Sequence, residues 1–162
     1  MGNVNCSIPT YIALSLRDKF RLKAFVETGL GQGTSALWAC QHFDMVVSIE
    51  ADGELVDKFR ANYPNSNAMI VHGDSAIEMI EVVNRLDIPA LFWLDAHTDD
   101  YTPVLAELAA INMSPLPHVI MIDDWRLFGA LPRWPSKEKV IVWATSNGRR
   151  YYDVDDVLVC HT

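Results

Sequence analysis

The residues best suited to do chemistry stand in one short turn, Glu27-Thr28-Gly29-Leu30-Gly31-Gln32-Gly33, which Thr34 follows. Its three alternate glycines permit positive φ angles and let the backbone approach a ligand closely, while a helix after them would offer free N–H groups. A dinucleotide fingerprint, Gly-x-Gly-x-x-Gly, would need a glycine where this chain has Thr34. The turn therefore predicts a site for a nucleoside cofactor other than a dinucleotide.

The charge of Glu27 narrows the choice of cofactor. A carboxylate at the base of the turn would repel a pyrophosphate but would attract the ammonium group of a methionine moiety. This sign favours S-adenosylmethionine over a nicotinamide dinucleotide. A solvated or helix-capping role for Glu27 is the alternative, because a glycine turn alone is weak evidence.

Two further acidic positions follow predicted strands. Glu50 ends the run Val46-Val47-Ser48-Ile49, where an acid can accept both hydroxyls of a ribose, although the same position also serves NAD. Asp74, in Gly73-Asp74-Ser75, stands where a purine amino group would arrive if the ribose lay on Glu50. The same three residues also form an ordinary helix N-cap, and both interpretations stay open.

Three more aspartates follow the later strands. Asp95 comes after the run 91–94, and Asp123 and Asp124 come after the run 119–122. Carboxylates gathered at adjacent strand ends repel one another unless a proton or a hard cation lies between them. Oxygen ligands suit Mg²⁺, with Mn²⁺ or Ca²⁺ as alternatives. We expect a metal site at these three aspartates, unless Asp124 points away or caps a following turn.

His97 stands two residues after Asp95. Because histidine side chains in general titrate near neutral pH, one placed here can remove the proton of a hydroxyl group. We therefore consider His97 and Asp95 the candidate catalytic residues. A metal ligand and a plain loop histidine are the alternatives for His97.

The elements that must position these residues alternate along the chain. Apolar runs that predict strands end close to each candidate residue, and each is followed by a segment suited to a helix. Near-continuous apolar runs are typical of a parallel sheet buried on both faces. The predicted strands are 24–26, 45–49, 68–71, 91–94 and 119–122, and the predicted helices are 8–23, 34–42, 52–63, 75–86 and 104–111. The helix 75–86 carries Ile77, Ile80, Val83 and Leu86 at helical spacing.

A different pattern follows residue 139. The runs 140–144 and 151–159 flank Asn147-Gly148, a dipeptide typical of a tight β-hairpin. We therefore predict an α/β fold with a Rossmann-like, doubly wound, mostly parallel sheet of about seven strands and an antiparallel C-terminal edge hairpin. One domain, 1–162, would contain an N-terminal helical segment (1–23), a cofactor-binding core (24–124) and the hairpin (139–162).

Composition disfavours several other classes of protein. With 162 residues, half of them apolar, the chain can bury one core. A formal net charge of −8 disfavours nucleic acid and anionic lipid as partners, since the basic runs 17–23 and 149–150 are short. Cys6, Cys40 and Cys160 lack the spacing of a disulfide framework or a zinc site. Without a signal-peptide pattern or an apolar run long enough to span a membrane, we expect a cytoplasmic protein.

Together these motifs resemble the class I S-adenosylmethionine-dependent methyltransferases. The segment Glu27-x-Gly29-x-Gly31-x-Gly33 matches their first motif, Glu50 their ribose acid, and Gly73-Asp74 their adenine-side position. The motifs around 91–97 and 118–124 are similar to those of macrocin-type and catechol-type O-methyltransferases, and to small bacterial methyltransferase-like proteins encoded with polysaccharide genes. The resemblance runs from about Ala24 to Asp124.

The resemblance implies methyl transfer to a hydroxyl group of a small molecule. In the metal-dependent members, acids at the positions of Asp95, Asp123 and Asp124 bind Mg²⁺, and the macrocin-type enzymes have an aspartate thought to act as base where this chain has His97. The implied cofactor-binding residues are Glu27, Thr28, Gly29, Gly31, Gly33, Thr34, Glu50, Asp74, Ser75 and Asp95.

Some alternatives stay open at this point. Only about 23 residues precede the first predicted strand, so the acceptor site is either open or completed by another subunit of a homo-oligomer. A non-catalytic binding module with the same fold, or a partner subunit, is a second hypothesis, and a nicotinamide-dependent oxidoreductase is a third. The segment 98–102 is a candidate lid. An apolar group after the fifth strand could line an acceptor pocket, form a dimer face or fold back onto the sheet; it contains Trp125, Leu127, Phe128, Leu131 and Trp134.

Overall fold

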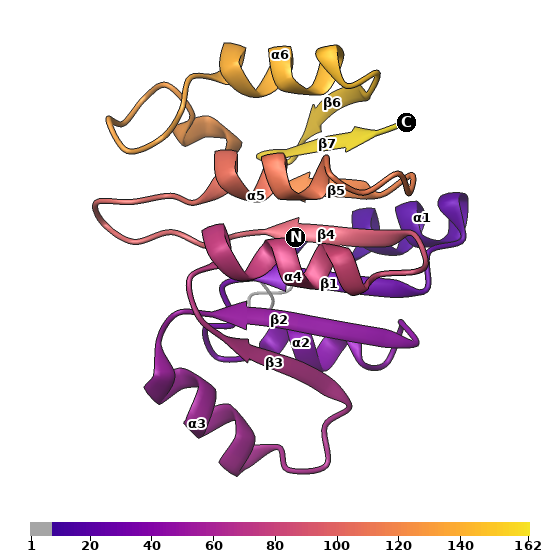
Figure 1. The fold of residues 1–162 in the computed structure, drawn as a ribbon, viewed down its shortest axis with the longest axis vertical. Helices are drawn as coiled ribbons and strands as arrows, with labels where there is room; N and C mark the ends of the chain where they lie inside the picture. Colours follow the sequence, from indigo (N-terminus) through magenta and orange to yellow (C-terminus); the bar gives the residue numbers. More distant parts are fainter. Residues whose placement is uncertain (1–7) are drawn as a thin grey trace.

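One seven-stranded sheet runs through the structure, a computed structural model that describes residues 8–162 (Figure 1). Cys6 and the first part of the predicted segment 1–23 lie outside the described residues. The strands are β1 (Ala24–Thr28), β2 (Met45–Glu50), β3 (Ala68–His72), β4 (Ala90–Leu94), β5 (Val119–Ile122), β6 (Arg150–Val154) and β7 (Val157–His161). Their order across the sheet is β3-β2-β1-β4-β5-β7-β6.

The winding of the sheet reverses between β1 and β4. From β1 the chain proceeds outward to β2 and β3, and it then crosses back to add β4 and β5 on the other side of β1. These five strands are parallel, whereas β7 is antiparallel to β5 and β6 is antiparallel to β7. The predicted doubly wound sheet with an antiparallel edge is confirmed. Ligands of such sheets bind where the winding reverses, beyond the carboxyl ends of the strands.

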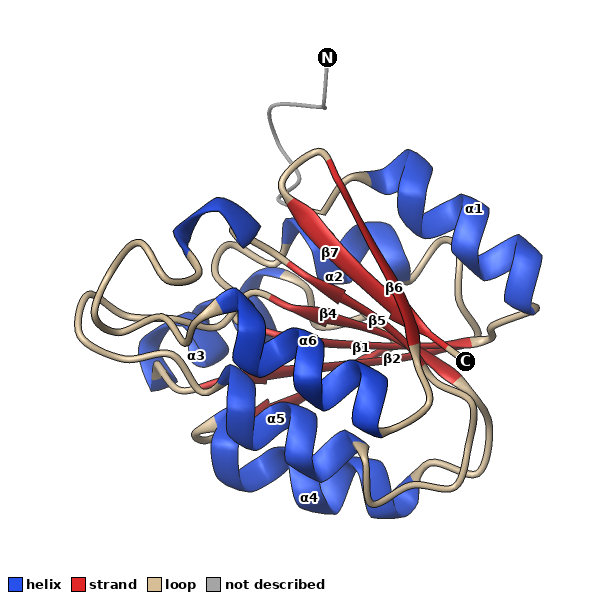
Figure 2. Cartoon of the chain, turned by 90° about the horizontal axis from the view of Figure 1, so that it is seen from above, coloured by secondary structure: helices blue, strands red, loops and turns tan. Residues whose placement is uncertain are grey.

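Helices cover both faces of the sheet (Figures 1 and 2). On one face lie α4, α5 and α6; on the other lie α1 and α2, with α3 joined to α2 through the small apolar cluster of Phe59, Leu30 and Ala36. The helices are α1 (Thr10–Phe20), α2 (Thr34–Ala39), α3 (Gly53–Asn62), α4 (Ser75–Arg85), α5 (Val104–Ile111) and α6 (Lys137–Ser146), with a short 3₁₀ turn η1 (Trp125–Leu127).

The central strands are apolar on both sides because both sides are covered. Every residue of β1 and of β4 is buried. Since successive side chains of a strand point to opposite faces, Phe92 packs in the core beneath α4, α5 and α6, and Trp93 packs in the core beneath α1. This double burial fixes the two strands whose ends carry the glycine turn and Asp95.

The predicted hairpin around Asn147-Gly148 is wrong. Residues 140–144 belong to helix α6, which begins at the N-cap Ser136 and buries Val140 and Ala144, four residues apart. Gly148 has φ +67 and ends the helix: its N–H donates to Thr145 O, and that of Arg149 donates to Ala144 O. This is a Schellman motif, in which glycine is as favourable as in a hairpin turn. The segment 139–162 is therefore a helix followed by the hairpin of β6 and β7.

The actual hairpin turns at Asp155 and Asp156. Both residues have positive φ angles, 50° and 67°, as a two-residue turn between antiparallel strands requires. Aspartate tolerates this conformation better than most residues because its short side chain can bond locally. The hairpin turn therefore lies in the acidic segment Asp153-Val154-Asp155-Asp156, although Asn147-Gly148 is the stronger sequence signal for a hairpin.

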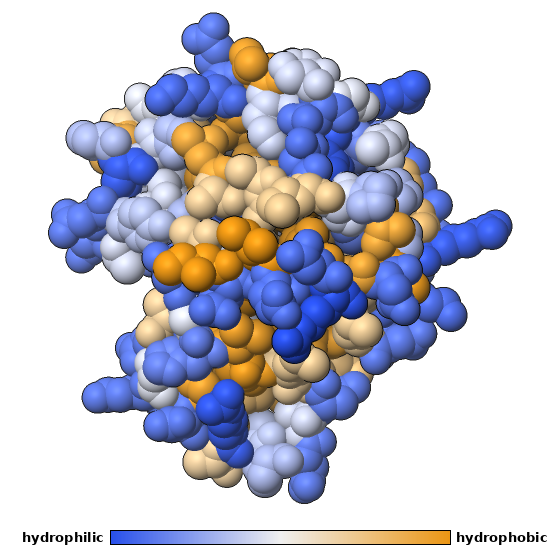
Figure 3. All heavy atoms as spheres, viewed as in Figure 1, coloured by the Kyte–Doolittle hydropathy of each residue, from blue (hydrophilic) through white to orange (hydrophobic). Residues whose placement is uncertain are grey.

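Helix α4 buries a different set of residues from the one that the spacing suggested. Val83 and Leu86 are buried with Met79 and Val82, whereas Ile77 is 67% exposed and Ile80 is 43% exposed. Apolar surface is visible on the face of the molecule that carries α4, α5 and α6 (Figure 3). A helix rich in apolar residues has more than one candidate stripe, and the sheet beneath selects one of them.

Two features of the structure concern the membrane and nucleic-acid partners considered above. Within residues 8–162 no helix is both long enough and apolar enough to cross a membrane. Arg149, half of one of the two short basic runs, is only 7% exposed, and its Nη1 donates to the carbonyl of His118 at 2.8 Å. The pair 149–150 therefore does not form a basic surface patch.

The end of α6 can be tested at Gly148. Nothing lies within 4 Å of a Cβ added there, so the cost of Gly148→Ala is the conformational cost of a positive φ alone. We expect Gly148→Ala to lower the free energy of unfolding by about 1 kcal/mol, and Gly148→Asn to lower it by less. Urea unfolding of both variants measures this, and an equal loss for alanine and asparagine would contradict the assignment.

Candidate functional site

A cavity of about 510 Å³ opens at the carboxyl ends of β1, β2, β3 and β4. Its size is typical of sites for small molecules and cofactors. A smaller hollow of about 210 Å³ adjoins it at the glycine turn and is lined by Thr34 and Ser35 as well. Of the residues singled out in the sequence, the larger cavity is lined by Gly29, Gly31, Glu50, Asp74, Ser75, Asp95 and His97.

The glycine turn needs its glycines for two different reasons. Gly29, Gly31 and Gly33 all have positive φ angles, 84°, 53° and 77°. A Cβ on Gly29 would lie 3.2 Å from the carbonyl oxygen of Asp95, and a Cβ on Gly33 would lie 2.3 Å from the ring of Phe59. The turn is therefore pressed between the β4 loop and α3, with Gly33 on the α3 side and outside the cavity wall.

Glu50 ties the glycine turn to the end of β2. Its Oε2 accepts a hydrogen bond from the N–H of Gly31 and its Oε1 accepts one from the N–H of Asp52, both at 3.0 Å. An ionised carboxylate has about four acceptor positions, so Glu50 keeps capacity for two more donors from the cavity. The arrangement suits a pair of ribose hydroxyls.

Asp74 and Ser75 occupy the wall on the β3 side. Asp74 is the N-cap of α4, where its side chain accepts from the N–H of Ala76 at 2.9 Å, and it also lines the cavity. Both interpretations of Asp74 are therefore compatible with the structure. Ile49, Ala51 and Leu55 add apolar surface to the same cavity, as a nucleoside base would require.

Glu27 does not line the cavity, contrary to the expected contact with a ligand ammonium. It is fully buried under the turn, where its carboxyl accepts hydrogen bonds from Ser35 Oγ at 2.5 Å and Ser48 Oγ at 2.7 Å. Burial raises the pKa of Glu27 to about 7, against the opposing effect of the two serine hydrogen bonds. Thr28 is also fully buried and outside the cavity wall. Glu27 thus supports the turn from below.

Glu107 is a second buried acid near the cavity, and it is not among the residues predicted from the sequence. It lies on α5, is 1% exposed and accepts a hydrogen bond from Ser75 Oγ at 2.5 Å. Burial raises its pKa to about 7, while the hydrogen bond from Ser75 and the nearby Thr28 hydroxyl act in the opposite direction. The sequence does contain a sign of this burial. Glu107 falls within the stripe of Val104, Leu108 and Ile111, where an amphipathic helix carries apolar residues.

The predicted metal trio is only partly brought together. Ligand atoms of Asp95, His97 and Asp124 all lie within 4.8 Å of one another, so the group contains His97 and leaves out Asp123. Asp123 is half-buried beside Asp95 with its pKa raised by burial. Asp124 does not point away: its φ of +54° turns the chain into η1 and its Oδ2 lies 3.4 Å from Nε2 of His97. The backbone conformation at Asp124 could not be read from the sequence.

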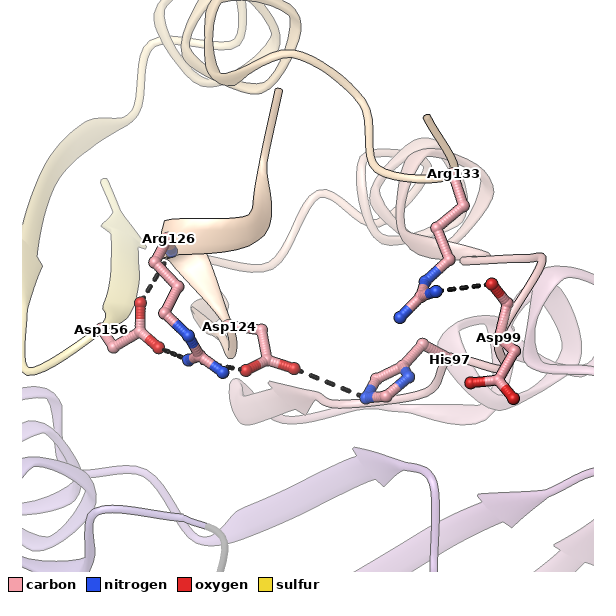
Figure 4. Close-up of polar contacts among 6 residues, drawn as sticks. All are labelled: His97, Asp99, Asp124, Arg126, Arg133 and Asp156. Carbon is pink, nitrogen blue, oxygen red and sulfur yellow. Dashed lines mark hydrogen bonds and ion pairs between the residues drawn. The ribbon is translucent and has the colours of Figure 1, made fainter. Parts of the chain in front are cut away.

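Two arginines flank this group (Figure 4). Arg126 Nη1 lies 2.8 Å from Oδ1 of Asp124 and also pairs with Asp156 of the β6–β7 turn. On the other side, Nη1 of Arg133 donates to the carbonyl of Asp99 in the segment 98–102. Neither arginine was a candidate, because Asp156 and Asp99, which hold them beside this group, are 30 and 34 residues distant in sequence.

Most of the apolar segment after β5 folds back onto the sheet, whereas Leu131 is 39% exposed. Trp125, Phe128 and Trp134 are each less than 10% exposed and belong to the core beneath α4, α5 and α6. Trp134 also packs near the ring of His97, with centroids 5.5 Å apart. Of the candidate lid, Thr98 and Tyr101 line the cavity. The segment 98–102 is thus part of the wall.

Comparison with known proteins supports the fold. No model of a known protein family and no curated protein matches this sequence. Solved structures do match. DesVI of Streptomyces venezuelae is 12% identical at a TM-score of 0.70, with 94% of this chain and 89% of that chain covered. An S-adenosylmethionine-bound amino pentose methyltransferase of Micromonospora echinaspora, involved in calicheamicin biosynthesis, is 10% identical with the same TM-score and coverage.

A third structure is an O-methyltransferase of Bacillus cereus in complex with S-adenosylhomocysteine. It is 16% identical at a TM-score of 0.68, with 98% of this chain and 83% of that chain covered. Structural matches at sequence identities this low show the fold, and they do not show the activity. The chain has the Rossmann-like fold of class I S-adenosylmethionine-dependent methyltransferases, as its motifs predicted.

The burial of Glu27 predicts a pH-dependent stability. Between its ordinary pKa of 4.5 and its folded value of about 7, the folded chain holds a proton that the unfolded chain releases. Stability contributed by this group therefore falls as the pH rises through that window. Glu27→Gln removes the effect, so its stability relative to wild type should rise by about 2 kcal/mol from pH 5 to pH 8.

Urea unfolding at the two pH values measures the difference. Glu81→Gln, at an exposed position on α4, is the control and should follow the wild-type pH dependence. Parallel curves for Glu27→Gln and wild type would show that Glu27 is ionised throughout.

Proposed function

We propose that this chain binds S-adenosylmethionine and transfers its methyl group to a hydroxyl group of a small molecule, assisted by a divalent cation. The observation that carries the proposal is that one cavity joins the positive-φ glycine turn, Glu50 and Asp74 at the switch point of the sheet. The same cavity is also lined by Asp95, which adjoins Gly29 of the turn, and by His97. Cofactor residues and candidate catalytic residues thus share one space.

The residues present fit the cofactor. The close approach of Gly29 to the Asp95 carbonyl leaves no room for a side chain, so the turn presents bare backbone to the cavity. Glu50 would hold the ribose hydroxyls and Asp74 the amino group of the base. The carboxylates of the wall, Glu50, Asp74 and Asp95, favour a cationic cofactor over an anionic dinucleotide.

The donor set also fits a hard divalent cation. Asp95 and Asp124 would hold it, with Asp123 beside Asp95 as a further oxygen donor. Mg²⁺ suits these oxygens best, with Mn²⁺ or Ca²⁺ as alternatives. When bound, such a cation lowers the pKa of a coordinated hydroxyl group and orients it. Arg126 neutralises Oδ1 of Asp124 and leaves Oδ2 on the side of His97.

His97 is the proposed base. If its Nε2–H donates to Asp124, the free nitrogen for accepting a hydroxyl proton is Nδ1. Trp134 packs near the imidazole ring, with ring centroids 5.5 Å apart. The backbone and side chains of the cavity place the two reactants, which is the main contribution a protein makes to a direct displacement.

A second candidate function is a binding module without methyl transfer. The ion pair between Arg126 and Asp124 favours it, because a guanidinium already satisfies one of the carboxylates that a metal would use. This candidate retains cofactor binding and lacks metal binding. It is separated from the first by measuring the two affinities independently.

Cofactor binding is tested by calorimetry with S-adenosylhomocysteine. We expect wild type to bind it, and Glu50→Gln to bind about tenfold more weakly, because the amide loses the charge-assisted bonds to two hydroxyls. Glu54→Gln is the matched control, since Glu54 is an exposed acid of the first turn of α3 that does not line the cavity. Binding of NAD without binding of S-adenosylhomocysteine would instead indicate the oxidoreductase.

Metal binding is tested with Mn²⁺ by electron paramagnetic resonance. Asp124→Asn should weaken Mn²⁺ binding more than about tenfold and leave the affinity for S-adenosylhomocysteine unchanged, since Asp124 does not line the cofactor cavity. Asp153→Asn, an exposed substitution on β6, is the control.

The variant His97→Ala separates the two roles considered for His97. Retained Mn²⁺ affinity in this variant agrees with a base, and a loss comparable to that of Asp124→Asn would make His97 a metal ligand. Wild type that binds no Mn²⁺ would favour the binding module.

A further inference from the structure

Glu107 is a buried acid that the proposed chemistry leaves without a role. Its helix, α5, is otherwise composed of apolar residues, and among residues 8–162 no lysine or arginine forms an ion pair with it. Burying a carboxyl group without a cation is unfavourable, and an apolar residue would pack the same position at lower cost. A function for the carboxyl explains its presence better than packing does.

The partner of Glu107 belongs to the cavity wall. Ser75 is the first residue of α4, is 5% exposed and follows Asp74, and both residues line the cavity. The charged or titratable groups near Glu107 are Asp74, at the N-cap of α4, and Tyr101, in the segment before α5. Thr28, at the end of β1, lies beside the same carboxyl. Glu107 thus contacts the wall from behind.

The hydrogen bond fixes the polarity of the Ser75 hydroxyl. A hydroxyl has one proton, and Ser75 donates it to Oε1 of Glu107 at 2.5 Å. The Ser75 oxygen therefore offers the cavity lone pairs, which accept hydrogen bonds, and no proton to donate. Asp74 beside it offers carboxylate oxygens, so two neighbouring residues of this wall present acceptors.

We propose that Glu107 is a specificity-determining residue of the cofactor site, which makes the wall select a base with an amino donor over one with a keto oxygen. This inference rests on the proposed function in that the ligand is a nucleoside. It adds that the choice of base depends on a residue that does not touch the ligand. Glu107 is accordingly a positioning residue that acts through Ser75.

The test compares S-adenosylhomocysteine with S-inosylhomocysteine, in which a keto oxygen replaces the 6-amino group. Calorimetry at pH 8 keeps Glu107 mainly ionised, given its pKa of about 7. Wild type should prefer S-adenosylhomocysteine by at least about tenfold. In Glu107→Gln the amide can donate to Ser75, whose proton is then free to turn toward the cavity. The preference should fall at least about threefold.

Two further variants keep the test decisive. Ser75→Ala removes the hydroxyl and should also reduce the preference at least about threefold, so it replaces Glu107→Gln if that variant does not fold. Glu27→Gln is the matched comparison, because Glu27 is equally buried and serine-bonded on the other face of β1. It should change both affinities by the same factor.

The outcomes separate the inference from the proposed function. If wild type binds S-adenosylhomocysteine but has no preference over S-inosylhomocysteine, or if the folded Glu107→Gln or Ser75→Ala variant keeps the full preference, the inference is overturned alone. If wild type binds neither compound, the proposed cofactor is wrong and the inference falls with it.

Discussion

The position of β1 between β2 and β4 is the constraint on which the rest of the site depends. At its end the backbone is hydrogen-bonded to both neighbouring strands: Gly29 N–H donates to Ile49 O at 2.9 Å, and Asp95 N–H donates to Thr28 O at 3.2 Å. The chain must then leave the sheet within a residue or two, in the narrow space beneath the loop after β4. Only a glycine turn fits there, and the cavity exists because such a turn leaves its backbone uncovered.

Much of the fold followed from the sequence, because apolar runs and strand-end polar residues are local signals. The five parallel strands and the cavity residues Glu50, Asp74 and Asp95 were found in this way. Features that depend on residues far apart in the sequence could not be predicted. Arg126 pairs with Asp124 and is also bound by Asp156, 30 residues later. Helix α6 was mistaken for a strand, since Gly148 suits a Schellman motif and a hairpin equally well.

The two buried glutamates illustrate the same limit in another form. Glu27 was recognised by its place in a motif, but its expected contact with the ligand was not observed, because a motif fixes the backbone and leaves the side-chain direction open. Glu107 was overlooked because it stands on an ordinary helix. Yet the two residues are built alike, each a buried carboxyl bonded to serine, on opposite faces of β1. The end of β1 is thus supported through acids on both sides, one toward α2 and one toward α4.

The contact between Asp156 and η1 has a consequence for the order in which the site is assembled on the ribosome. The glycine turn, Glu50, Asp74 and Glu107 all belong to the segment up to α5, so they leave the ribosome before Asp156 does. The loop that carries Asp124 receives three contacts from Asp156: two to the backbone N–H groups of Trp125 and Arg126, and one to the side chain of Arg126. During synthesis, the residues that line the cavity therefore emerge before Asp156, whose contacts hold the loop that places Asp124 near His97.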